Sequence, residues 1–169
     1  GFWAWDPVEN AAFMPWLTGT AFLHSMMIQE KRNMLKIWNV VLIIITYGLT
    51  IIGTFLTRSG VVNSVHSFTQ SEIGPAFLVF LAVILVVGFA LLFRRIQMLE
   101  SEHKMEAVLC RENVFLVQNV IFIGMAFTVL LGTTFPLLAE AIRGTKLSIQ
   151  APFFNTIMAP MGYVLFFLM

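Results

Sequence analysis

Long apolar runs separated by short charged connections dominate the pattern of this chain. A helix needs about 20 residues to cross ~30 Å of hydrocarbon, and these runs are continuous rather than alternating, so helices are favoured over barrel strands. Five stretches qualify, the last of them at the chain end: residues 10–29, 38–56, 75–93, 113–138 and 153–169. The pattern predicts an all-α, polytopic transmembrane helical bundle.

Composition supports a membrane protein. The chain has 59% hydrophobic and 11% charged residues and a mean hydropathy of +0.87, whereas soluble domains carry about a quarter charged residues. Residues 1–169 therefore form a single membrane domain, and we expect a fragment of a longer protein because the chain ends within an apolar run. The lone Cys110 excludes an internal disulfide or a Cys-x-x-Cys redox pair. No basic face suited to nucleic acid is visible.

The basic residues predict the orientation. Seven of them fall in the connections 30–37 and 94–112, and three fall at 57–74 and 139–152. Lys and Arg are enriched in cytoplasmic loops. The first pair of connections is therefore expected in the cytoplasm, and the second pair, with the N-terminus, on the outer (periplasmic) side.

The N-terminal segment contains a helix start. Asp6 followed by Pro7 and Glu9 is typical of a capping box, because Asp accepts from free backbone amides and Pro fits the first helical position. Trp3 and Trp5 then lie at the membrane interface, where amphipathic rings are favoured. Together with Phe2 they form an aromatic shelf over the helix end.

His24 is an ionisable residue inside the first apolar run, where burial is costly and function is the default hypothesis. Gly19, Thr20 and Ala21 precede it by about one turn and leave room for a planar group such as haem, whose iron takes imidazole as an axial ligand. The alternative is a neutral histidine hydrogen-bonded to a neighbouring helix, with small residues for close packing.

The outer connection 57–74 carries a second histidine, His66. Its apolar residues fall on one face at helical spacing, so a short interfacial helix is predicted, with His66 on its border. A histidine in a polar loop is ordinarily solvated, but this one would share the outer face with the tryptophans. The outer cations that could meet haem propionates are Arg58, Arg143 and Lys146.

Three stretches together resemble a known family. They are WAWDPVENAAFMPWL within residues 1–17, GTFLTRSGV at 53–61 leading to VHSF at 65–68, and APFFNT at 151–156. The first resembles the tryptophan-rich WWD haem-handling motif in the form found in the CcmF-type cytochrome c haem lyases, and the other two agree with that family.

The resemblance implies an enzyme, a haem lyase acting on the periplasmic face of a bacterial inner membrane or its mitochondrial counterpart. Haem from a CcmE-type chaperone would be attached to the thiols of a Cys-x-x-Cys-His apocytochrome c. Subunits of the CcmH and CcmI type would reduce and present that apocytochrome. Membrane lipid is the remaining partner.

The resemblance also implies site residues. His66 would be one of two outer ligands of the substrate haem, on the surface made by Trp3, Trp5 and Asp6, with Arg58 as a propionate contact. His24 would ligate a separate buried haem b. The second histidine of each pair would lie outside this chain.

Two other functions stay open. A haem carrier or exporter would bind haem without making the covalent bond. A proton-coupled transporter subunit would use His24 as a proton site and the tryptophans only as interfacial anchors.

Overall fold

The computed structural model describes residues 2–59, 73–99, 111–144 and 147–169, and within these ranges every regular element is helical. The elements are α1 (Pro7–Arg32), α2 (Lys36–Arg58), α3 (Gly74–Arg94), the 3₁₀ helix η1 (Ile96–Leu99), α4 (Arg111–Arg143) and α5 (Ala151–Leu168). The all-α class predicted from the sequence is confirmed.

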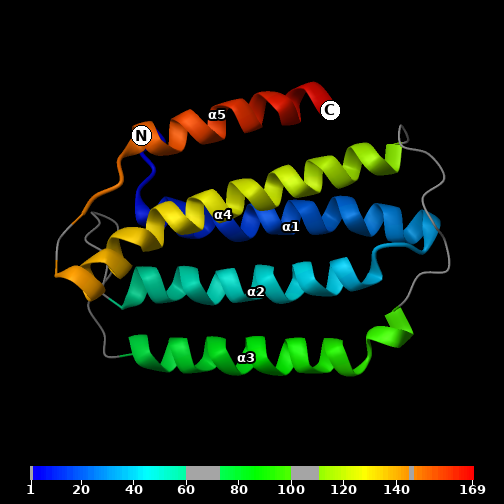
Figure 1. Ribbon diagram of the computed structural model, residues 1–169, viewed down its shortest axis with the longest axis horizontal. Helices are drawn as coiled ribbons and strands as arrows, with labels where there is room; N and C mark the ends of the chain where they lie inside the picture. The colour runs from blue at the N-terminus through cyan, green and yellow to red at the C-terminus, as the bar shows by residue number, and fades with distance from the viewer. Residues whose placement is uncertain (1, 60–72, 100–110, 145–146) are drawn as a thin grey trace.

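Each helix runs in the direction opposite to that of the helix before it in the chain. In space the helices lie side by side in the order α3, α2, α1, α4, α5 (Figure 1). One end of the bundle therefore gathers the starts of α1, α3 and α5 and the ends of α2 and α4 (Figure 1). We call this end the tryptophan end, because the segment before α1 carries Trp3 and Trp5. The opposite end holds the end of α1 and the start of α2.

Within the described residues, four helices are long and apolar enough to cross a membrane: α2, α3, the Asn113–Arg143 part of α4, and α5. The helix α1 is not among them, because polar residues such as Asn10, Thr18, His24 and Ser25 interrupt it. It packs between α2 and α4 (Figure 1), and its Asn10, Thr18 and Ser25 side chains are buried. The helix covers the predicted stretch 10–29, and its crossing of a membrane stays a prediction.

The helix ends extend past the apolar stretches. The longest extension is in α4, which begins at Arg111 and ends at Arg143, inside both flanking connections predicted as loops. Backbone hydrogen bonding continues into polar sequence at a membrane surface, so an apolar run marks the lipid-facing part of a helix and not its ends. The short helix η1 lies in the predicted connection 94–112.

The core lies between α1, α2, α4 and α5. Its fully buried members include Met14, Leu17, Leu56, Val129 and Phe154. The backbones of α1 and α2 approach closely, since a Cβ on Gly53 would lie 3.0 Å from the carbonyl oxygen of Ala11. Small residues permit such approaches between membrane helices. The first turns of α1, which follow the segment with Trp3 and Trp5, are therefore packed tightly against α2.

Candidate functional site

Trp5 joins the N-terminal segment to α5. Its indole Nε1 donates to Oδ1 of Asn155 at 2.7 Å, and its ring stacks on Phe154 with centroids 4.9 Å apart and planes at 12°. Phe154 is 2% exposed, so Trp5 rests on the core. The first and third of the motifs found in the sequence therefore meet at the tryptophan end.

Three further rings extend this contact into an aromatic cluster. Trp3 lies edge-on to Trp5 at 5.8 Å and to Phe13 at 5.3 Å, and Phe13 stacks on Trp16 at 5.6 Å. Trp3 is 47% and Trp16 58% exposed. We define Trp3, Trp5, Phe13 and Trp16 as the aromatic surface, which presents indole rings at the tryptophan end while Trp5 anchors them.

The acidic residues of the same segment hold the start of α1. Oδ1 of Asp6 accepts from the amide of Val8 at 2.9 Å, and Oε2 of Glu9 accepts from the amides of Asp6 and Ala4 at 3.1 and 3.0 Å. This is the capping box expected from Asp6, Pro7 and Glu9. Asp6 thus has a structural task in addition to the outer-site role that the resemblance implied.

Asn10 holds the backbone of Trp5. Trp5 adopts a left-handed conformation, φ 59°, which is uncommon for a bulky residue. The amide Nδ2 of Asn10, a residue that is 1% exposed, donates to the Trp5 carbonyl at 3.2 Å and to Thr133 Oγ1 at 3.0 Å. The side chain therefore stabilises the turn that directs the indole ring toward α5.

His66 and Lys146 lie outside the described residues, as does the predicted interfacial helix. The helix ends that flank the His66 connection are described. A Cβ on Gly74, at the start of α3, would lie 3.1 Å from Cβ of Ser59, which follows α2. Both ends belong to the tryptophan end, as do Arg58 and the exposed Arg143 (Figure 1).

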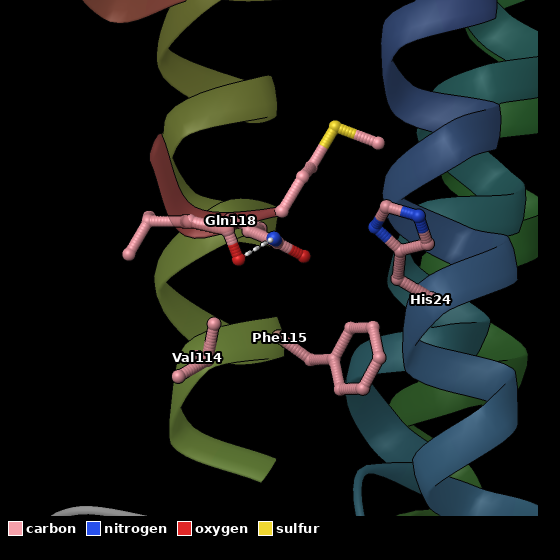
Figure 2. Close-up of a pocket in the computed structure, with 6 residues that line it drawn as sticks. His24, Val114, Phe115 and Gln118 are labelled. Carbon is pink, nitrogen blue, oxygen red and sulfur yellow. Dashed lines mark hydrogen bonds between the residues drawn. The ribbon is translucent and has the colours of Figure 1, made fainter. Parts of the chain in front are cut away.

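His24 lies on α1 beside a cavity of about 340 Å³ formed mainly with α4. The lining residues are His24, Val114, Phe115, Gln118, Leu168 and Met169. The imidazole ring is 5.6 Å from the rings of both Phe115 and Phe122. Its Nδ1 is buried and has no hydrogen-bond partner among the described residues. Figure 2 shows the ring extending toward α4.

The small residues before His24 do not make this space. Gly19 faces α2, where an added Cβ would meet Thr46 at 3.9 Å, and Ala21 is buried in the bundle. Neither they nor Thr20 line the cavity. The expectation that these residues leave room beside His24 is therefore wrong in detail, since the room lies between α1 and the facing side chains of α4 and α5.

Two polar residues of the site were not singled out from the sequence. Asn155 belongs to the third motif, but its link to Trp5 needs the fold. Gln118 interrupts the apolar stretch of α4 and is 4% exposed. An uncharged polar residue inside a membrane helix is itself a signal, because its polar atoms need partners there.

Comparison with known proteins gives a consistent result. Residues 1–62 match the family described as Cytochrome C assembly protein. Similar curated proteins include the cytochrome c-type biogenesis proteins CycK of Rhizobium meliloti, 47% identical over 92% of this chain and 23% of its own length, and CcmF of Pseudomonas aeruginosa, 43% identical over 95% and 24%.

A solved structure named Cytochrome c Heme Lyase CcmF superposes with a TM-score of 0.73 and 36% identity, covering 99% of this chain and 23% of that one. The chain thus spans about a quarter of the length of the relatives it matches. Its helical fold agrees with that of the solved structure, and the chain belongs to the CcmF-type family of cytochrome c-type biogenesis proteins.

Proposed function

We propose that this chain is the part of a membrane haem lyase that positions haem for attachment to apocytochrome c. The aromatic surface would support the substrate haem on the periplasmic face of a bacterial inner membrane. The observation that carries the proposal is the contact of Trp5 with Phe154 and Asn155, which joins two of the stretches that resemble the haem-lyase family into one surface. The end of α2 and the start of α3, which flank the connection with His66 in the sequence, lie at the same end of the bundle (Figure 1).

Attachment adds each thiol S–H of the apocytochrome across a haem vinyl group. A sulfur–carbon bond forms, the hydrogen goes to the other vinyl carbon, and no net oxidation occurs. The main demand is orientation, since each vinyl must meet the correct sulfur. Rigid rings and an iron-ligating His66 would meet that demand, with Arg58 near the propionates. Haem delivery and thiol reduction would belong to CcmE-type and CcmH/CcmI-type partners.

His24 would hold a second haem, of b type, within the membrane. Imidazole is an axial ligand of haem iron, and Phe115 and Phe122 provide apolar walls beside it. The cavity and the buried nitrogen without a partner fit such a group. Bound there, haem would supply one-electron chemistry, while this chain supplies the ligand and the apolar surroundings.

The experiment is haem attachment by the complete protein. Membranes containing it, or a Trp3→Ala/Trp5→Ala variant, are supplied with haem chaperone and reduced apocytochrome, and covalent haem is measured on the product. The proposal expects product from the wild type, a large loss in the variant, and an unchanged b-type haem band in both. Haem binding without any covalent product would instead identify a haem carrier.

A further inference from the structure

Another cavity lies at the end of the bundle opposite the tryptophan end, where α1 and α3 end and α2 begins (Figure 1). Its volume is about 320 Å³, and its walls come from the start of α2 and from η1. The lining residues are Leu35, Lys36, Ile37, Trp38, Val41 and Leu99. We call it the Lys36 cavity, because it combines one positive charge with apolar and aromatic walls.

The 3₁₀ helix η1 closes one side of the Lys36 cavity. It packs against both α2 and α3 and lies beside the start of α2 (Figure 1). The turn that leads into it is held by the amide of Met98, which donates to the carbonyl oxygen of Arg95 at 3.0 Å. Leu99 at its end lines the cavity, and the exposed Arg94 and Arg95 come directly before it in the chain.

Positive charge dominates this end of the bundle. The described basic residues here are Lys31, Arg32, Lys36, Arg94 and Arg95, and among the described side chains of this end only Glu30 is acidic. Lys36, Arg94 and Arg95 form no ion pair with a described residue. An excess of basic residues on one side is expected from membrane insertion alone. The apolar cavity beside one of these cations is the additional feature that points to a ligand.

The walls of the Lys36 cavity fit an amphiphile with a negative head. A small anion would gain nothing from apolar walls, because it is better hydrated in water. Trp38 lies in the first turn of α2, and tryptophan rings are enriched at the level of the lipid head groups. Basic pockets between membrane helices at that level bind anionic lipid head groups. Both α2 and α3 are apolar enough to cross a membrane, so lipid surrounds this part of the bundle.

We propose that the Lys36 cavity binds a phospholipid with a net negative head group. Lys36 pairs with the lipid phosphate, and Ile37, Val41 and Leu99 contact the adjoining part of an acyl chain. Arg94 and Arg95 add positive potential that favours an anionic over a zwitterionic head. This binding does not depend on haem, so it stands or falls separately from the proposed haem-lyase function.

The test uses the complete protein in phosphatidylcholine vesicles that contain a small fraction of lipid with brominated chains, which quench indole emission on contact. The emission of Trp38 is the difference between wild type and Trp38→Phe. Brominated phosphatidylglycerol should quench it at a several-fold lower fraction than brominated phosphatidylcholine. Lys36→Gln should reduce this preference roughly fivefold, the usual contribution of one basic residue near an anionic head group, and Lys36→Arg should retain it.

Arg143→Gln is the matched control, because it removes one positive charge at the tryptophan end and should leave the preference unchanged. A preference reduced equally in Arg143→Gln and Lys36→Gln would reflect the charge of the whole protein and overturn the inference. Equal quenching by the two lipids, no quenching of Trp38, or recovery of its emission with inorganic phosphate would also overturn it. If Trp38→Phe does not fold, mass spectrometry of phosphatidylglycerol bound to the wild type and to Lys36→Gln decides in the same way.

Discussion

The indole N–H of Trp5 lies 2.7 Å from the side-chain oxygen of Asn155, a residue 150 positions away. The same indole stacks on the neighbouring Phe154. The two interactions dock the segment before α1 onto α5, so the orientation of the aromatic surface depends on both helices.

Asn155→Leu removes the acceptor and leaves the stack. We expect a loss of about 1 kcal/mol in stability, the usual net value of such a hydrogen bond, and a lower yield of cytochrome c. Asn155→Asp keeps an acceptor oxygen, so it should retain most of the stability and most of the cytochrome c yield. Thermal unfolding in detergent measures the first effect, and a double-mutant cycle with Trp5→Phe isolates the pair. Additive effects in that cycle would contradict the contact.

Gly132 provides the space for Phe154. A Cβ added there would lie 2.5 Å from the Phe154 ring, a rigid group that cannot give way at its end. Gly132→Ala should therefore cost about 1–3 kcal/mol, as overpacking of a core does, and should displace the ring that supports Trp5. The matched control is Gly162→Ala on α5, where nothing lies within 4 Å. Equal melting temperatures for the two variants would count against this packing.

The roles of Asp6 can be separated by choice of substituent. Asp6→Ala removes the cap of α1 and should cost about 1 kcal/mol. Asp6→Ser keeps a capping oxygen without the charge, so it should restore stability. If Asp6 acts mainly through the cap, haem attachment follows stability in both variants. Normal stability of Asp6→Ser with strongly reduced attachment would instead indicate a direct role of the carboxylate at the haem site.

Asn10 stabilises the turn at Trp5 from within the bundle. Asn10→Leu leaves the Trp5 carbonyl without its donor, and we expect a destabilisation of about 1–3 kcal/mol. Thr133→Val removes only the second acceptor of the same amide and should cost less. Chemical unfolding of the two variants provides the comparison. A Thr133→Val variant as unstable as Asn10→Leu would show that the contact with Trp5 is unimportant.

Much of the fold follows from local sequence. The apolar runs predict the helical class because lipid offers no hydrogen-bond partners to backbone N–H and C=O groups, which a helix pairs internally. The cap at Asp6 is equally local, since its donors and acceptors lie within a few residues. The ends of α4 could not be predicted from hydropathy, because helical hydrogen bonding does not stop where the apolar run stops.

The site was predictable only in part. His24 and the tryptophans stand out because their chemistry is unusual at their positions. The docking of Trp5 on Asn155 depends on two helices distant in sequence, and no local pattern encodes it. The position of Gln118 on the same cavity as His24 likewise depends on the packing of α1 against α4. The role of His66, which lies outside the described residues, stays a prediction.

The reduced-minus-oxidised haem spectrum of the complete protein, in wild type and in His24→Ala and His66→Ala variants, tests the central claim most directly. The account predicts a b-type haem band that His24→Ala abolishes while the protein remains in the membrane. It predicts that His66→Ala keeps this band and loses cytochrome c yield. A band unchanged in His24→Ala, or erased equally by both substitutions, would contradict the assignment of two separate haem sites.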